Sequence, residues 1–289
     1  MKFVTYTYEG ASAVGVLSAD DSAVIPASEL GLKSESMNEL ICELGGSLPA
    51  IPDGAKSIPL TAVKLDAPIP EPKQDVVCLG LNYRDHVDEA TRADAVFDVQ
   101  RGDAVYFAKR LQRAVAPDGI IDGHFDICDS LDYEVELGVI IGRDAKNVKA
   151  VDAGDYIFGY TIINDVSARN LQTRHKQWYF GKSLDDFTPM GPCIVSAETI
   201  GAMPELGIRC YVNGELRQSS NTHNMIFDIP YVIEELSAGM TLKAGTVIAT
   251  GTPSGVALGM PPETRRYLKS GDVIRCEIDG IGVLENTVG

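Results

Sequence analysis

Short apolar runs bounded by turn residues recur along this chain and set its fold class. They occupy residues 76–80, 132–142, 156–167 and 190–196. Asn213-Gly214 and Asp279-Gly280 each separate two β-type flanks, which is a strong hairpin signal. Few segments have helical spacing. The pattern therefore predicts an α+β protein that is predominantly β.

Two segments have the periodicity of amphipathic helices. The first spans residues 36–44 and stops before Gly45 and Gly46, and the second spans residues 228–236, where Asp228 can cap the N-terminus. Their apolar residues lie at helical spacing: Met37, Leu40, Ile41 and Leu44 in the first, and Ile229, Val232, Ile233 and Leu236 in the second.

Residues 1–70 are expected to form a small β-rich N-terminal domain, ahead of a larger domain over residues 71–289. The N-terminus alternates as a strand does, with Val4, Tyr6 and Tyr8 on one face and Phe3 and its i+2 partners on the other. Six prolines between positions 49 and 72 predict an extended connector between the two domains.

Composition excludes several classes of function. Lys and Arg number 25 against 41 Asp and Glu, a net charge of −16, which argues against a nucleic-acid-binding surface. It does not exclude a pocket for a small anion. We find no signal peptide and no apolar run near the ~18 residues of a membrane span, so no membrane partner is expected. The six scattered cysteines form no CxxC pair, which favours a reducing cytoplasm.

The most informative local feature is the acidic sequence DYEVEL at residues 132–137. On a strand, Glu134 and Glu136 project side by side, and two carboxylates so close repel unless a proton or a cation intervenes. Asp165 ends another apolar run, which could lie beside the first. Three carboxylates describe a site for Mg²⁺ or Mn²⁺. The alternative is the polar face of an ordinary sheet.

Basic and amide residues follow the third acid. A helix beginning near Asp165 would carry Arg169 and Gln172 along one face, and Lys182 comes shortly after. These side chains could donate hydrogen bonds to a bound carboxylate or enolate, or form only helix-surface pairs. Trp178 and Tyr179, near Lys182, could form a wall of the pocket or pack in the core.

His86 and Glu89 follow the first apolar run at a spacing of three residues. In a helix the two side chains can meet, so the carboxylate could hold one imidazole nitrogen while the other takes a proton from water. The alternative is a surface pair without a catalytic role.

The combination resembles the fumarylacetoacetate hydrolase family. The matching motifs are collinear from about residue 76 to residue 288: GLNYRDHVDE, DYEVELGVIIG, GYTIINDVSARNLQ, GKSLDDFTPMGP, YVNGELRQ, ATGTPSGV and the terminal EIDGIG. The resemblance implies a mixed β-roll or sandwich catalytic domain, commonly a homodimer, with bound Mg²⁺ or Mn²⁺.

The resemblance also implies roles for nine residues. It assigns the metal to Glu134, Glu136 and Asp165, catalysis to His86, Glu89 and Lys182, and substrate contacts to Arg169, Gln172 and Thr252. Larger members of the family have a further acidic ligand upstream that we do not find here, so we expect three protein ligands.

The expected activity is hydrolytic cleavage of a carbon–carbon bond in an acylpyruvate or another 2,4-diketo acid. The metal would chelate the 2-oxo acid, and His86 with Glu89 would activate water. Decarboxylation of oxaloacetate and isomerisation of a hydroxymuconate-like diacid are alternatives on the same scaffold. A binding protein for a divalent cation or small acid, without turnover, is the non-enzymatic alternative.

Overall fold

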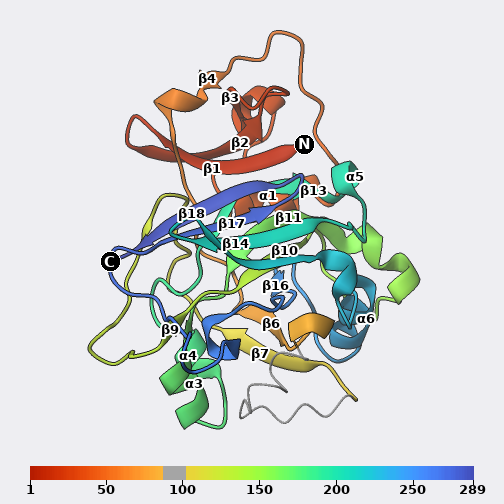
Figure 1. The fold of residues 1–289 in the computed structure, drawn as a ribbon. Helices are drawn as coiled ribbons and strands as arrows, with labels where there is room; N and C mark the ends of the chain where they lie inside the picture. The colour runs from red at the N-terminus through yellow and green to blue at the C-terminus, as the bar shows by residue number, and fades with distance from the viewer. Residues whose placement is uncertain (87–101) are drawn as a thin grey trace.

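The computed structural model describes residues 1–86 and 102–289. In these ranges the strands form one large sheet, one five-stranded sheet and one short ladder, with few helices around them (Figure 1). The prediction of a mainly β, α+β fold is confirmed.

The large sheet runs through the middle of the molecule. Its described strands lie in the order β4 (Ile58–Pro59), β3 (Ala23–Pro26), β2 (Ala11–Leu17), β1 (Lys2–Tyr8), β13 (Met190–Ser196), β11 (Ile157–Asn164), β10 (Val135–Ile141), β16 (Val247–Ala249), β6 (Val76–Gly80) and β7 (Val105–Lys109), with β5 (Lys64–Leu65) paired to β1. β16 and β6 pair in parallel, whereas β10 pairs antiparallel with both of its neighbours.

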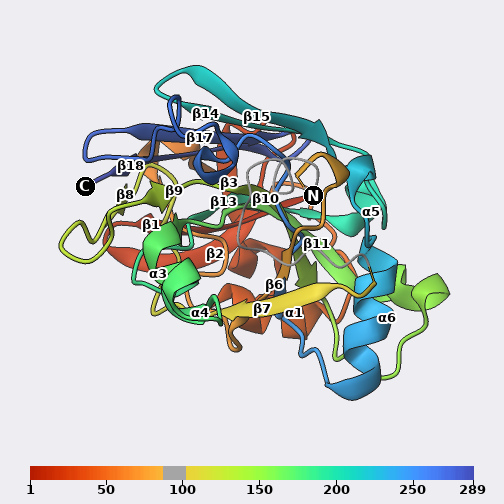
Figure 2. The ribbon, with the colours of Figure 1, turned by 60° about the horizontal axis from the view of Figure 1, so that its bottom comes forward.

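The second sheet packs over β10, β11 and β13 of the first. Its strands lie in the order β15 (Glu215–Asn221), β14 (Gly207–Val212), β17 (Val273–Ile278), β18 (Gly282–Val288) and β8 (Ile120–Ile121). Figure 2 shows it as a layer along one side of the larger sheet. Both predicted hairpins are present, β14–β15 and β17–β18.

The two amphipathic helices form where their periodicity placed them. α1 (Met37–Leu44) begins after Ser36, whose hydroxyl accepts from the Glu39 amide, and α6 (Ile229–Gly239) begins after Asp228, whose carboxylate accepts from the Tyr231 amide. The remaining described helices are short: α3 (Arg169–Arg174), α4 (Tyr179–Lys182), α5 (Ala197–Ile200), and the 3₁₀ segments Ala27–Leu30, Leu60–Ala62, Ala150–Tyr156, Thr222–Asn224 and Ala257–Gly259. None of the described helices is both long and apolar enough to cross a membrane.

The first strand joins the N-terminal residues to the rest of the sheet. β1 pairs with β13, so that Phe3 lies opposite Ile194. Successive side chains of β1 point into two different hydrophobic clusters. Phe3 packs in the cluster that contains α1, whereas Val4 and Tyr6 pack in the cluster between the sheets. The N-terminal strands therefore extend the central sheet, and the domain division at residue 70 stays a prediction.

The centre of the fold places two strand ends side by side. β10 and β11 are buried along their whole length, and Val135 at the start of β10 pairs with Asn164 at the end of β11. The predicted run over residues 132–142 is split, because Asp132 instead pairs with Ser167 in the ladder of β9 (Leu131–Asp132) and β12 (Ser167–Ala168). The residues next to these ends carry the charges described below.

Candidate active site

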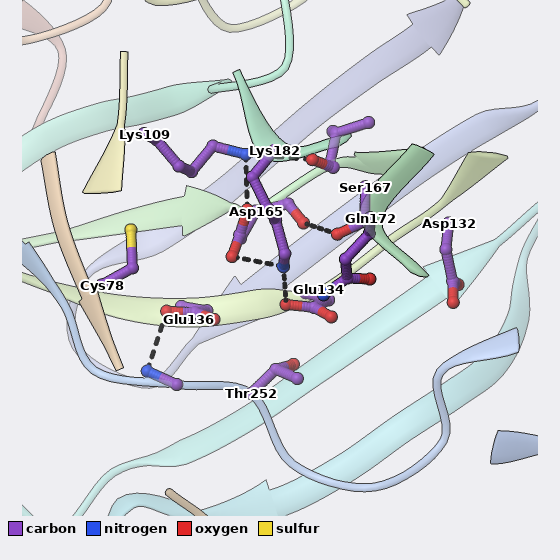
Figure 3. Close-up of polar contacts among 12 residues, drawn as sticks. Cys78, Lys109, Asp132, Glu134, Glu136, Asp165, Ser167, Gln172, Lys182 and Thr252 are labelled. Carbon is purple, nitrogen blue, oxygen red and sulfur yellow. Dashed lines mark hydrogen bonds and ion pairs between the residues drawn. The ribbon is translucent and has the colours of Figure 1, made fainter. Parts of the chain in front are cut away.

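Three carboxylates meet where β10 begins and β11 ends. Glu134 precedes β10, Glu136 lies in it, and Asp165 follows β11. The Asp165 amide donates to the Glu134 carbonyl at 2.8 Å, which joins the two segments. One oxygen of each carboxylate lies within 4.8 Å of the others (Figure 3). The structure thus brings together the three acids that the sequence selected.

Glu136 is the acid with the least compensation. Burial raises its pKa well above the ordinary value, and the charges of Asp165 and Glu134 raise it further. The Gly251 amide donates to Glu136 Oε2 at 2.8 Å. Gly251 has a φ of +93°, so the turn that aims this amide at the carboxylate favours a glycine.

Two lysines hold Asp165 from opposite sides. Lys182 Nζ donates to Asp165 Oδ2 at 2.6 Å and to Glu134 Oε2 at 2.8 Å, while Lys109 Nζ donates to Asp165 Oδ1 and to the Val166 carbonyl (Figure 3). Burial lowers the pKa of Lys109 despite its pairing with Asp165. Burial also opposes the charge of Lys182, but Asp165 and Glu134 outweigh it and raise that pKa.

Arg169 links a fourth carboxylate to the site. Its Nε donates to Asp132 Oδ2 at 2.8 Å, Nη2 to Glu134 Oε1 at 2.6 Å and Nη1 to Gln172 Oε1 at 3.0 Å. Burial opposes the ionisation of Glu134, yet Lys182 and Arg169 beside it lower its pKa to about 2. Glu134 is therefore anionic at neutral pH.

The prediction of a helix that begins near Asp165 is wrong. Residues 167–168 form a strand instead, because Ser167 pairs with Asp132, and α3 begins only at Arg169. Asp165 and Arg169 do not share a helix face. Arg169 and Gln172 do share one, and both line the pocket.

Sequence reasoning missed Lys109 and Asp132. Lys109 is the only charged residue of the strand VYFAK and is fully buried, and a buried lysine requires an anionic partner. Asp132 is also fully buried, and its carboxylate accepts from the amides of Tyr133, Ala257 and Leu258 as well as from Arg169. The signal for Lys109 was a charge at the end of an apolar strand, whereas Asp132 stands at the head of the acidic sequence DYEVEL.

A pocket opens beside the acids. His86, Gln172, Lys182 and Thr252 line it together with Glu134, Glu136 and Arg169, and its other side is apolar. The Thr252 hydroxyl donates to the Val135 carbonyl at 2.9 Å, which fixes it against β10. Glu89 lies outside the described residues, so its pairing with His86 stays a prediction.

The three acids fit a divalent cation. All the donors are carboxylate oxygens, which Mg²⁺ and Mn²⁺ prefer, and the raised pKa of Glu136 shows that its ionised form lacks the compensating positive charge that a cation would supply.

Comparison with known proteins then decides the family. The model of the fumarylacetoacetate (FAA) hydrolase C-terminal domain matches residues 75–289. The chain belongs to the fumarylacetoacetate hydrolase family. The resemblance found in the motifs is thereby confirmed, and the chain is a member of a family of enzymes that act on small molecules.

Relatives in this family have names that cover more than one reaction. The chain is 47% identical over 230 residues to oxaloacetate tautomerase YisK of Bacillus subtilis, which covers 80% of this chain and 74% of that protein. It resembles a fumarylacetoacetate hydrolase from Exiguobacterium antarcticum at 38% identity and a TM-score of 0.86, over 100% of this chain and 99% of the other. It also resembles 5-carboxymethyl-2-hydroxymuconate delta-isomerase from Mycobacterium smegmatis at 31% identity and a TM-score of 0.77, with the same coverage.

Proposed function

We propose that this protein binds a 2-oxo acid through Mg²⁺ or Mn²⁺ held by Glu134, Glu136 and Asp165, and that it moves a proton between the keto and enol forms of that acid. The names of the tautomerase and isomerase relatives support proton transfer as the reaction. A bound cation would supply Lewis-acid stabilisation of the negative charge that develops on the substrate oxygens.

The charge balance of the site carries this proposal. Four carboxylates, those of Asp132, Glu134, Glu136 and Asp165, face three cationic side chains among the described residues: Lys109, Arg169 and Lys182. With all seven ionised, the cluster has one negative charge too many. A divalent cation reverses the balance to one positive charge, which the carboxylate of a 2-oxo acid then neutralises.

The other side chains of the site have separate roles in this proposal. Arg169 holds Glu134 and Gln172 in place, since its guanidinium already bonds to both. Lys182 and Gln172 line the pocket and can donate hydrogen bonds to the substrate oxygens. His86 lines the same pocket, and an imidazole can accept and return a proton near neutral pH.

Hydrolytic cleavage of an acylpyruvate is the second candidate. The position of His86 in the pocket favours it, because the predicted pair with Glu89 would let this imidazole deprotonate a water molecule. Decarboxylation of oxaloacetate needs the same bound 2-oxo acid without the water.

One product assay distinguishes these reactions. The Mn²⁺-loaded protein is incubated separately with oxaloacetate, acetylpyruvate and a hydroxymuconate-type diacid, and products are identified by NMR. Proton exchange or isomerisation with the carbon skeleton intact is the expected result. Acetate with pyruvate would instead establish the hydrolase, and carbon dioxide with pyruvate the decarboxylase.

The matched control for this assay is Glu136→Gln, which removes one proposed ligand and keeps the size of the side chain. It should abolish turnover and Mn²⁺ binding together. Wild-type protein that binds Mn²⁺ but converts none of the three acids would contradict the proposal and favour a binding protein.

The homodimer and the cytoplasmic location are part of the same proposal, because both were inferred from the sequence and its family resemblance. Light scattering of the purified protein should give twice the 31.1 kDa mass of one chain. A monomer would contradict the expectation.

A further inference from the structure

The apolar side of the pocket is built around one indole ring. The apolar part of the lining consists of Leu79, Gly80, Leu81, Phe107 and Trp178, and it shares the pocket with the charged residues. Trp178 immediately precedes α4, and its carbonyl accepts from the Lys182 amide at 3.2 Å. The ring is thus attached one helical turn away from a lysine that holds Glu134 and Asp165.

The indole is seated directly on a glycine. A Cβ atom added to Gly80 would lie 2.7 Å from Trp178 Cη2 and closer still to Cζ3, distances that real Cβ atoms do not show. Gly80 is not among the glycines with a positive φ, so its backbone does not require a glycine. The absence of a side chain at position 80 therefore serves to admit the ring.

Phe107 holds the other edge of the indole. The two rings meet edge to face, with centroids 5.2 Å apart and planes at 66°, a favourable arrangement for aromatic pairs. Lys182 Nζ in turn lies 5.1 Å from the centroid of the Phe107 ring. The indole is therefore fixed by its contacts with Gly80 and Phe107, and it lines the same pocket as Glu134 and Glu136.

The pocket beside this ring is narrow. The volume open to water-sized molecules is about 20 Å³, so the described lining residues leave little free space between them. A substrate whose carboxylate and 2-oxo group reach the acids must direct the rest of its chain away from them, and the apolar residues form the lining that the charged and polar side chains leave.

We propose that Trp178, seated on Gly80 and Phe107, sets the upper limit on the length of the 2-oxo acid that the pocket accepts. This inference rests on the proposed function, since it assumes that the acid end binds at Glu134, Glu136 and Asp165. The substrates would be short 2-oxo acids with a compact distal group, and longer acyl chains would be excluded by the indole.

Binding measurements test this without assuming which reaction follows. We would measure, by calorimetry on the Mn²⁺-loaded protein, the affinity for 2,4-dioxo acids whose acyl end grows from methyl to pentyl, with oxalate as a ligand that has no distal group. Wild-type protein should bind the methyl compound at least about tenfold more tightly than the pentyl compound. Trp178→Ala should raise the affinity for pentyl relative to methyl by about 10–200-fold, the range that pocket size can discriminate.

Three controls keep the outcomes distinct. Tyr179→Ala removes a neighbouring ring that is 44% exposed and does not line the pocket, and should leave the chain-length preference unchanged. Trp178→Phe keeps an aromatic ring and should give an intermediate preference. Oxalate should bind Trp178→Ala and the wild type within about twofold, which shows that the variant is folded.

Gly80→Ala tests the contact between Gly80 and the indole ring of Trp178. Its added Cβ should displace the indole into the pocket and weaken binding of the methyl compound, and the same change in a Trp178→Ala background should have little effect. Such non-additivity is expected of residues that are in contact or share a cavity, and not of distant, independent sites.

Two results separate failure of this inference from failure of the proposed function. If Mn²⁺ and oxalate do not bind the wild type, the proposed function is wrong. If they bind but Trp178→Ala has the chain-length preference of the wild type, Trp178 does not set the limit.

Discussion

The strand pair β10–β11 differs from the pair β14–β17 in what its two faces touch. Every residue of β10 and β11 is buried, because one face packs on the second sheet and the other on the core that contains α1. Along β14 the burial alternates, with Ile208, Cys210 and Val212 turned inward. The outer face of β14 carries Arg209, whose ion pair with Asp279 is partly exposed.

This difference in burial decides where an unpaired charge would destabilise the protein. A charge beside β14 is solvated, and its partner can be replaced by water. A charge at the ends of β10 and β11 has no such substitute, so each carboxylate there is held by a cation, a backbone amide or both. The same burial that makes the site costly to assemble leaves each charge there dependent on a fixed partner.

The largest effect is expected from Arg169→Met. It removes the guanidinium that pairs with Asp132 and Glu134 and leaves both carboxylates buried. The free energy of unfolding, measured by urea denaturation, should fall by about 3–5 kcal/mol. A loss below about 1 kcal/mol, as at an exposed pair, would remove the distinction between the two strand pairs.

Lys109→Met should have a smaller effect. Asp165 loses one lysine but keeps Lys182, so only part of its compensation disappears. The same denaturation should show a loss of about 1–3 kcal/mol, the cost of a buried polar group without its partner. An unchanged midpoint of urea denaturation would mean that Lys109 does not stabilise the buried charge cluster.

Glu136→Gln should change stability with the opposite sign. The raised pKa of Glu136 means that ionising it in the folded protein is unfavourable, so the amide should raise the free energy of unfolding at neutral pH, measured by the same denaturation. This gain should vanish as the pH falls below the ordinary carboxyl pKa, where the wild-type Glu136 is protonated in the folded and the unfolded states alike.

Thermal unfolding with Mn²⁺ gives Glu136→Gln a second measurement. At about 100 times its dissociation constant the cation should stabilise the wild type by about 2.7 kcal/mol, and the variant should show no such gain. An equal Mn²⁺ response in both proteins would contradict the role of Glu136.

The smallest effect is expected from Arg209→Met on the outer face of β14. Its pair with Asp279 measures 2.9 Å but is partly exposed, and such pairs contribute about 0–1 kcal/mol. Urea denaturation in parallel with Arg169→Met provides the comparison. A loss near that of Arg169→Met would show that burial does not separate the two sites.

The sequence predicted what depends on local periodicity. The alternation at Glu134 and Glu136 placed both carboxylates on one side, and Asp228 caps the second helix as predicted. Apolar runs and hairpin signals were sufficient for the mainly β fold.

Contacts between residues that are far apart in the sequence could not be predicted from local periodicity. Lys109 reaches Asp165 from β7, 56 positions away in sequence, and Asp132 reaches Arg169 through the β9–β12 ladder. That ladder also replaced the predicted helix after Asp165 by a strand, since pairing with a distant segment outweighed the local preference. Such partners follow from strand register, which periodicity alone does not determine.

Trp178 is the only tryptophan of the chain, and it stands in the wall of the pocket. All indole fluorescence of the protein therefore originates beside Lys182 and Phe107, without background from a second emitter. A cation or acid arriving there changes the surroundings of that one ring, so its emission reports occupancy of the pocket directly. The tryptophan emission of the native protein can therefore be measured without an added fluorescent label.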